Sequence, residues 1–168
     1  VDGQTTTIQS ILEEYLKYES TTGCTVSEIV QLEIICIGTK ILTNEDIAFM
    51  NSNSMLSLKQ LDLQRANVYD QKDGVANKLS KGAFQNVSKY ESLSLPRNLV
   101  AIGDNTFLNS KIDNIITIPS GVTEFGSDWF KDGKYVCFAA SVPVAQASAG
   151  LTNVQAVFVD EAYIGSYR

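Results

Sequence analysis

The residues of this chain that could carry out chemistry are few and far apart. Its 168 residues contain no histidine, and its three cysteines are Cys24, Cys36 and Cys137. Histidine is the commonest general base at neutral pH, and a cysteine nucleophile needs a neighbouring base. The cysteine spacings do not match a zinc site. We therefore expect no transition metal, no cofactor and no enzymatic activity, and we expect all three cysteines to be buried as apolar residues.

Carboxylates are the remaining candidates for acid–base catalysis. Asp62 lies in a stretch that alternates between apolar and polar residues, whereas Asp104, Asp128 and Asp132 lie in polar segments beside glycines. Aspartate is common in turns because its side chain accepts hydrogen bonds from nearby backbone N–H groups. We therefore interpret the three loop aspartates as structural residues rather than as catalytic ones.

The overall charge argues against two classes of partner. The chain has 13 lysines and arginines against 19 aspartates and glutamates, which gives a net charge of -6. Nucleic acids and anionic lipid surfaces both select for clustered cations, so neither is an expected partner. No apolar run reaches the ~18–20 residues that a transmembrane helix needs. The 44% content of hydrophobic residues is typical of a single globular domain.

A 23-residue repeat organises the centre of the chain. The positions that recur at this spacing are Leu95-Pro96 with Ile118-Pro119, Ile102-Gly103 with Phe125-Gly126, and Phe84 with Phe107 and Phe130. An earlier copy begins at Leu58, and its counterpart begins at Tyr90, so the interval between them exceeds the repeat by a nine-residue insertion. Self-similarity at such a period is typical of solenoids, in which each repeat forms one coil.

The repeat predicts where the strands begin and end. Alternation directs the leucines of each L-x-x-L-x-L segment inward and the residues between them outward. Proline cannot donate a hydrogen bond to a ladder, so Pro96 and Pro119 mark strand ends. We expect one continuous parallel sheet, in sequence order, from strands near 32–37, 59–64, 91–95, 115–118 and 136–140. An antiparallel sandwich is the alternative, but it gives no reason for a constant register.

Single positions within the repeat carry further predictions. Gly103 and Gly126 suit bends with unusual backbone dihedrals, and the phenylalanine four residues after each should fill the interior of its coil. Ile112 precedes Ile116 by four residues, where the repeat has three, which predicts a bulge or a shifted register.

The nine-residue insertion is polar and falls in the stretch 70–77. Asp70 and Asp73 within it could join backbone carbonyls around a weak calcium site. Their spacing does not match an EF-hand loop, and the closing glutamate is missing. A calcium site is therefore a minor alternative to a loop without metal.

The repeat resembles a known family when its units are compared in full. The segments LPRNLVAIGDNTF (95–107) and IPSGVTEFGSDWF (118–130) are similar to the BspA-type leucine-rich repeat, with units of roughly L-x-x-I-x-I-P-x-x-V-x-x-I-G-x-x-A-F. The resemblance covers roughly residues 29–168. It implies an α/β solenoid, a right-handed coil with a parallel sheet on one face. Trp129 stands where the family usually has alanine, so it needs a larger space beside Phe130.

On this basis the chain, 1–168, is expected to be a single leucine-rich-repeat domain. We assign residues 1–28 to an N-terminal helical cap, 29–134 to the repeats and 135–168 to a C-terminal capping strand unit. The ends of a solenoid expose a hydrophobic cross-section, so caps are required there.

Two helices are predicted near the N-terminus. Apolar residues at helical spacing predict a helix from Thr7 to Glu19, which we interpret as the cap; a partner-binding or membrane-surface helix is the alternative. A second, short helix is predicted over residues 44–51, capped by Thr43 or Asn44. We expect this helix to insert three side chains into the core, namely those of Ile47, Ala48 and Phe49.

A ligand of such a coil would meet the outward residues of the strands. The register places on this candidate binding face Gln60, Asp62, Gln64, Glu91, Ser92, Ser94 and Thr117. These side chains are polar and mildly acidic, with no aromatic side chain on which a sugar could stack. Five strands at ~4.8 Å spacing give a face on the order of 300 Å², well below the ~800 Å² per partner of a standard interface. We expect this face alone to support weak or multivalent binding.

The resemblance also implies a function. Related proteins act in adhesion to matrix proteins and in bacterial coaggregation, so we expect a non-enzymatic repeat protein that binds a macromolecular partner, in particular a protein. The expected location is outside a bacterium or on its surface, with a signal or anchor segment removed ahead of Val1. The alternative is a structural or accessory spacer module that has no ligand of its own.

Overall fold

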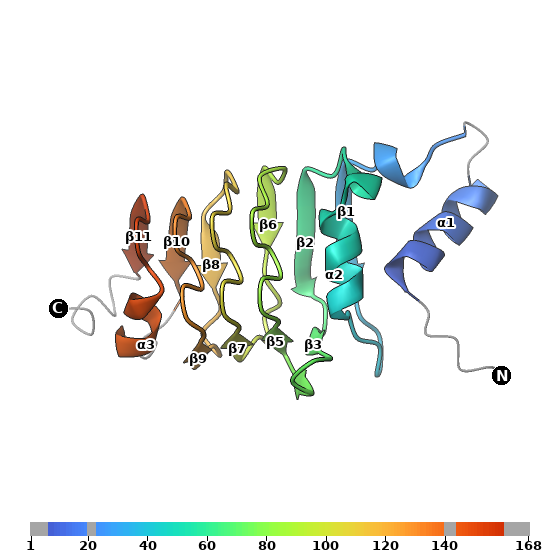
Figure 1. Ribbon diagram of the computed structural model, residues 1–168. Coiled ribbons are helices and arrows are strands. Elements are labelled where there is room, and N and C mark those ends of the chain that lie inside the picture. Colours follow the sequence, from blue (N-terminus) through green and yellow to red (C-terminus); the bar gives the residue numbers. More distant parts are fainter. Residues whose placement is uncertain (1–6, 20–22, 140–143, 160–168) are drawn as a thin grey trace.

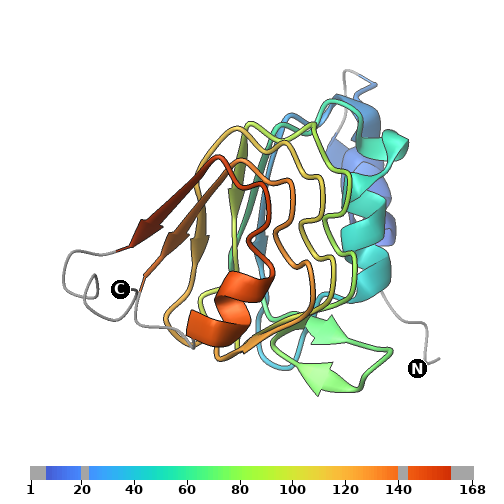
Figure 2. The ribbon, with the colours of Figure 1, turned by 60° about the vertical axis from the view of Figure 1, so that its left-hand side comes forward.

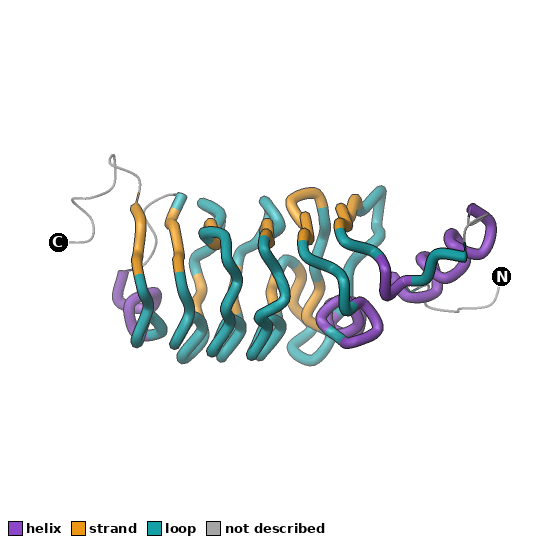
Figure 3. The backbone as a smooth tube through the Cα atoms, turned by 90° about the horizontal axis from the view of Figure 1, so that it is seen from above, coloured by secondary structure: helices purple, strands orange, loops and turns teal. Residues whose placement is uncertain are grey.

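The chain forms a row of stacked coils in the computed structural model, which describes residues 7–19, 23–139 and 144–159. Successive coils lie side by side along one axis, and each places a strand on the same side of the molecule (Figure 1). Seen from above, the strands and the loops of consecutive coils follow one another in sequence order (Figure 3).

Six parallel strands form the strand side. They are β1 (Gln31–Ile35), β2 (Gln60–Arg65), β6 (Ser92–Ser94), β8 (Ile116–Ile118), β10 (Tyr135–Phe138) and β11 (Ala156–Val159). All their pairings are parallel and in sequence order, as predicted. Leu61, Leu93, Ile116 and Val136 are buried and follow one another from strand to strand as the inward residues of the coils. β6 and β8 each end one or two residues before a proline, so the predicted strand ends are also confirmed.

The prediction of one continuous sheet is wrong. The strand side consists of two three-stranded sheets, β1-β2-β6 and β8-β10-β11, and among the described residues no ladder joins β6 to β8. The side chain of Asn114 bridges the break: the Leu93 N–H donates to its Oδ1 (3.1 Å), and its Nδ2 donates to the Leu93 carbonyl (3.3 Å). Asp113 occupies the repeat position of the buried Tyr90, but it is exposed and Ile112 is buried instead. The register shift expected at Ile112 is therefore the cause of the break.

Asn114→Asp is expected to weaken this junction. Aspartate at neutral pH keeps an acceptor for the Leu93 N–H but loses the donor to the Leu93 carbonyl, so we expect a loss of about 1–3 kcal/mol in unfolding free energy. Urea unfolding measures the change. The matched control is Asn98→Asp at an exposed hydrogen-bonded asparagine, which should stay within about 0.5 kcal/mol. Equal losses in the two variants would contradict the bridging role of Asn114.

A second parallel ladder runs along the opposite edge of the coils. It consists of β5 (Lys78–Leu79), β7 (Ala101–Ile102) and β9 (Glu124–Phe125). Here the 23-residue repeat holds without interruption from strand to strand. The insertion folds as an antiparallel hairpin of β3 (Tyr69–Asp70) and β4 (Val75–Ala76), which projects below the coils (Figure 2). Neither this ladder nor the hairpin was predicted from the sequence.

The repeating phenylalanines fill the interior, as predicted. Phe84, Phe107 and Phe130 are buried and in contact as a column: the rings of Phe84 and Phe107 are stacked with centroids 5.5 Å apart, and the ring of Phe130 is tilted against that of Phe107 with centroids 5.7 Å apart. The next coil adds Phe138, whose ring lies 6.2 Å from that of Trp129. The aromatic column therefore runs along the axis of the coils and links them to one another.

The predicted role of Gly103 and Gly126 needs correction, because neither has a positive φ. Their need for glycine is steric: a Cβ at Gly103 would lie 2.7 Å from the Lys81 nitrogen, and one at Gly126 only 2.3 Å from the Asp104 nitrogen. The left-handed positions lie in the turns instead, in two rows that follow the period of the repeat: Gly82, Asn105 and Asp128, and Asn86, Asn109 and Asp132. Asparagine and aspartate tolerate this conformation better than other side chains.

The two predicted N-terminal helices are present as α1 (Ile8–Glu19) and α2 (Asn44–Asn51). Thr43 caps α2, and its hydroxyl accepts a hydrogen bond from the Asp46 N–H. The residues that α2 inserts include Ile47 and Met50, whereas Ala48 is exposed and Phe49 is half-buried. The expected insertion of Ala48 is therefore wrong, because the helix turns that residue toward solvent.

α1 contacts α2 and the short 3-10 helix η1 (Val26–Glu28), and a second 3-10 helix, η2 (Asn53–Met55), follows α2. Ile8 and Leu12 of α1 pack against the core, and the Ile8 N–H donates to the buried carboxylate of Asp46 at 2.8 Å. Ile11 and Tyr15 remain exposed on the other side of the helix. α1 thus meets the coils along one narrow side.

Trp129 has the larger space that its size requires. Its indole is buried beside Phe130 and donates a hydrogen bond to the Ala147 carbonyl of α3 (Val144–Ala149) at 3.0 Å. Gly150 makes room for the ring, since a Cβ there would lie 2.1 Å from the indole Cδ1. α3 and Gly150 therefore pack against Trp129 near the C-terminal end of the described coils.

The cysteines differ from the prediction that all three are buried. Cys24 is exposed, Cys36 and Cys137 are half-buried, and none of the three forms a disulfide. Cys137 faces outward on β10 between the buried Val136 and Phe138, which explains its partial exposure. Cys36 lies just beyond the end of β1 and packs against the edge of the core.

Candidate binding surface on the strand side

The strand side brings together the residues predicted to form the binding face. In β2 and β6 the register pairs Gln60 with Ser92 and Asp62 with Ser94, and each of the four is next to at least one buried leucine. Gln64 continues this row in β2. The two remaining predicted residues lie at its borders: Glu91 is exposed just before β6, and Thr117 is exposed on β8 across the break.

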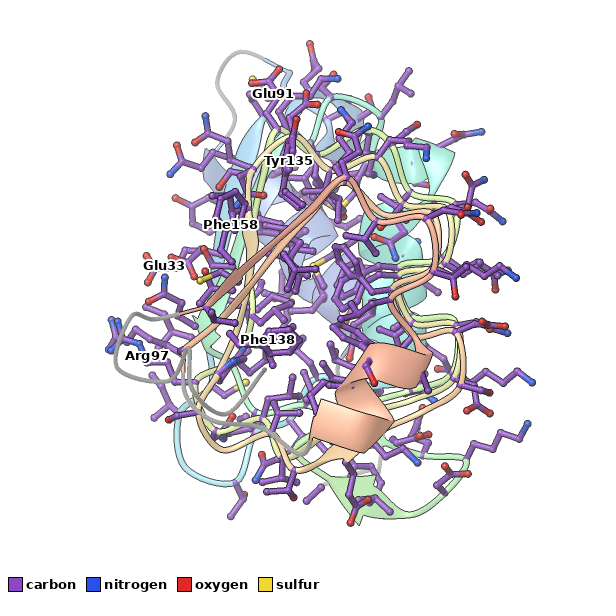
Figure 4. All side chains as sticks on the ribbon, turned by 90° about the vertical axis from the view of Figure 1, so that its left-hand side faces the viewer. Glu33, Glu91, Arg97, Tyr135, Phe138 and Phe158 are labelled. Atoms are coloured by element: carbon purple, nitrogen blue, oxygen red, sulfur yellow. The ribbon has the colours of Figure 1, made fainter. Side chains whose placement is uncertain are left out.

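The C-terminal half of the same face is apolar, which the sequence analysis missed. Thr117 is followed in register by Cys137 and Phe158, and Tyr135 by Ala156. Ile115 and Phe158 are each 43% exposed. Figure 4 shows Phe158 on the outer side of the strands, together with Glu33 and Arg97, whereas Phe138 points into the interior. Extending the alternation beyond residue 117 would have found these aromatic residues.

The N-terminal half of the face is polar and carries charges of both signs. Glu33 on β1 faces Arg65 on β2 at 4.0 Å. The guanidinium of Arg97, from the loop after β6, donates twice to Gln64 Oε1, at 2.7 Å and 3.1 Å. Both arginines are exposed, so such contacts contribute little stability and leave the cations accessible to a partner. Arg97 was not among the residues predicted from the sequence.

A groove of about 320 Å³ lies where the two halves meet, at the break between β6 and β8. Gln64, Ser94 and Arg97 line one wall, and Asn114, Ile115 and Thr117 line the other. Its volume is at the lower limit of ligand pockets, which suits one large side chain of a partner. The groove combines a cation and an amide on one wall with an exposed isoleucine on the other.

The repeat that builds this surface can be assigned to a family by direct comparison. Residues 27–137, about two thirds of the chain, match the family model of the BspA type leucine-rich repeat region (6 copies). The chain belongs to the BspA-type leucine-rich repeat family. No curated protein and no solved structure matches the chain.

The BspA-type region contains five of the six strands of the candidate surface in whole or in part. The match begins ahead of β1 and ends within β10, so α3 and β11 lie beyond it. The boundaries assigned to the two caps stay predictions. Within the described ranges, no helix is both long and apolar enough to cross a membrane.

Two of the four candidate aspartates, Asp62 and Asp104, accept hydrogen bonds from the protein's own backbone, in agreement with a structural role. Asp104 accepts hydrogen bonds from the Ser127 N–H and hydroxyl, which lower the pKa of its carboxyl group. Asp62 accepts from the Gln64 N–H at 2.9 Å. Asp128 and Asp132 adopt the left-handed conformation in turns.

The calcium alternative at the insertion receives no support from the geometry. Asp70 is buried, and its Oδ1 accepts hydrogen bonds from the Asn44 side chain and from two backbone N–H groups. Lys78 pairs with both Asp70, at 3.7 Å, and Asp73. Protein donors therefore already occupy these carboxylates. In the described part of the chain, no three histidine, cysteine or acidic residues are grouped as metal ligands would be.

Proposed function

We propose that this BspA-type repeat protein is a non-enzymatic surface or secreted protein that binds a protein partner through its strand side. The observation that carries the proposal is the groove at the sheet break, which opens between the polar half of the face and the half with exposed apolar residues. Interfaces concentrate their binding energy in a few anchors that enter pockets. The groove supplies such a pocket on the outward face of the strands.

The chemistry of the groove indicates what an anchor would need. The exposed side of Arg97 favours an acidic or carbonyl group, and Ile115 favours an adjacent apolar one. The face is small, on the order of a few hundred Å², so a single copy is expected to bind weakly and several copies on one surface to bind strongly. Weak, multivalent binding fits an adhesive role outside the cell, which the family resemblance supports.

Thr117→Arg is the variant that tests this proposal. Thr117 lines the groove, and a long cationic side chain there would obstruct it and repel Arg97. We expect the purified protein, immobilised at high density, to retain purified fibronectin, laminin or collagen, and Thr117→Arg to reduce the retained amount at least about tenfold. Surface plasmon resonance measures the amount retained by the unmodified protein and by the variant.

Thr123→Arg is the matched control, because it makes the same change at an exposed threonine beside β9, on the other ladder. It should leave retention unchanged. If Thr117→Arg and Thr123→Arg both retain as much matrix protein as the unmodified chain, the strand side is not the binding surface. If none of these proteins is retained by the unmodified chain, the alternative of a spacer module without its own ligand is favoured.

A further inference from the structure

A large hollow lies away from the strand side, between α2 and the coils that follow it. One part, of about 640 Å³, extends from the β3–β4 hairpin along the corner formed by β5, β7 and β9. A second part, of about 530 Å³, continues beside η2 and the turn before Lys89. Ala48, Gly82 and Ala83 line both parts, so the two adjoin, and together they are called the trough here.

The trough exists because one coil differs from its successors. The coil between β1 and β2 carries the helix α2, whereas the later coils cross the same side in tight turns (Figure 2). The turns are held close by backbone bonds such as Gly82 N–H to the Asp104 carbonyl, at 2.9 Å. α2 therefore stands higher than the neighbouring coils, and small residues form the floor beside it. Ala48, which was expected in the core, is exposed at the centre of this trough.

The charges along the trough balance. Four lysines and four acidic residues line it, and several of them pair with one another. The contact with Lys78 lowers the pKa of Asp73, and the same contact raises the pKa of Lys78, so both stay charged near neutral pH. Lys89 donates to three backbone carbonyls, those of Met50, Ser52 and Met55. Such a lining has no excess of either sign with which to attract a polyanion or a polycation.

Hydrogen-bonding groups with remaining capacity are spread along the walls. They include the exposed side chains of Lys81, Gln85, Asn86, Ser88 and Glu124. Few large apolar side chains line it: Ile102 and Val87 are buried, Phe125 is half-buried and Leu56 is exposed. A ligand hydroxyl both donates and accepts, and it can therefore pair with an ammonium, an amide or a carboxylate. A chain of hydroxyl-bearing rings matches this alternation of donors and acceptors.

We propose that the trough between α2 and the following coils binds an uncharged oligosaccharide. The small floor admits a ring to full depth, the mixed walls pair with its hydroxyl groups, and the balanced charge disfavours sulfated or otherwise anionic glycans. This site is separate from the groove on the strand side, so either can exist without the other.

Nuclear magnetic resonance titration of the full chain, labelled with ¹⁵N, tests the proposal. The probes are cellohexaose, mannohexaose and chitohexaose, with a heparin hexasaccharide as the anionic comparison, each added to millimolar concentration. We expect at least one neutral probe to shift amide signals of residues 82–86 and 101–104, and heparin to shift none of them. Ala48→Trp should block the trough and raise the dissociation constant at least about tenfold.

Two further variants make the result decisive. Ala48→Trp could weaken binding by disturbing α2 rather than by filling the trough. Gln85→Trp places the same bulk on an exposed residue of the second part of the trough, outside α2, so it should weaken binding without that side effect. Glu45→Trp changes an exposed residue of α2 that does not line the trough, and it should leave binding intact. The proposal is overturned if no neutral probe binds, if heparin binds instead, if the shifts lie on the strand side, or if both trough variants keep the wild-type affinity.

Discussion

Replacing Phe107 by alanine is expected to cost about 3–5 kcal/mol of unfolding free energy, the range for truncation of a buried aromatic residue. Phe107 is fully buried and is the middle member of the aromatic column, with Phe84 stacked on one side and Phe130 on the other. Its removal therefore leaves a cavity, and the coils on both sides lose their packing contacts with the ring. Chemical denaturation followed by circular dichroism measures the loss.

Phe158→Ala provides the comparison for this prediction. It removes the same atoms from a ring that is 43% exposed at the C-terminal end of the strand side. The loss there should be smaller, about 1–2 kcal/mol, because only part of the ring leaves water on folding and its truncation leaves no enclosed cavity. A similar loss at both positions would show that Phe107 does not join the coils as the stacking distances indicate.

Gly126→Ala is expected to destabilise the protein by about 3 kcal/mol or more, at or above the upper end of the usual range for overpacking. The added methyl group would lie 2.3 Å from the Asp104 nitrogen and 2.5 Å from the Gly103 carbonyl carbon. Both are backbone atoms of the preceding coil, so the methyl group fits only if two coils move apart. Thermal and urea unfolding of the variant report the size of the effect.

Gly121→Ala separates this steric effect from the general effect of adding a methyl group. Gly121 is exposed in the same coil, and its nearest neighbour would be the Leu99 carbonyl oxygen at 3.1 Å. A shift of a few tenths of an ångström relieves that contact, so the change should stay within about 1 kcal/mol. Comparable stability of Gly126→Ala and Gly121→Ala would contradict the close stacking of backbones at Gly126.

The repeat made most of the fold predictable, because equal spacing in sequence places residues at equal positions on consecutive coils. The parallel strands, the inward leucines and the phenylalanine column follow from that register alone. α2 was predictable for a different reason, since Thr43 and Asp46 form a local capping box that depends on few distant contacts. The outward residues up to Thr117 were predictable from the alternation of polar and apolar residues, and the same alternation also applies to β10.

The features that escaped prediction depend on contacts between coils. The bridge from Asn114 to the Leu93 backbone connects residues on two coils, and nothing in either local sequence marks it. Gly103 and Gly126 were assigned unusual dihedrals because glycine is usually needed for them, whereas their true constraint is the backbone of the coil beneath. The trough likewise arises because α2 projects beyond the coils that follow it. That difference cannot be predicted from the sequence of α2 alone.

The two edges of the coils differ in how strictly they keep the period of the repeat. On the β5-β7-β9 edge the sequence interval between paired positions is constant, as in Lys78, Ala101 and Glu124. On the strand side the interval varies: it is shorter than the repeat from Ile116 to Val136 and longer than the repeat from Leu61 to Leu93. Since the constant edge and the aromatic column keep the coils aligned, the coils accommodate the inserted β3–β4 hairpin and the shorter step from β8 to β10 while the strands stay parallel.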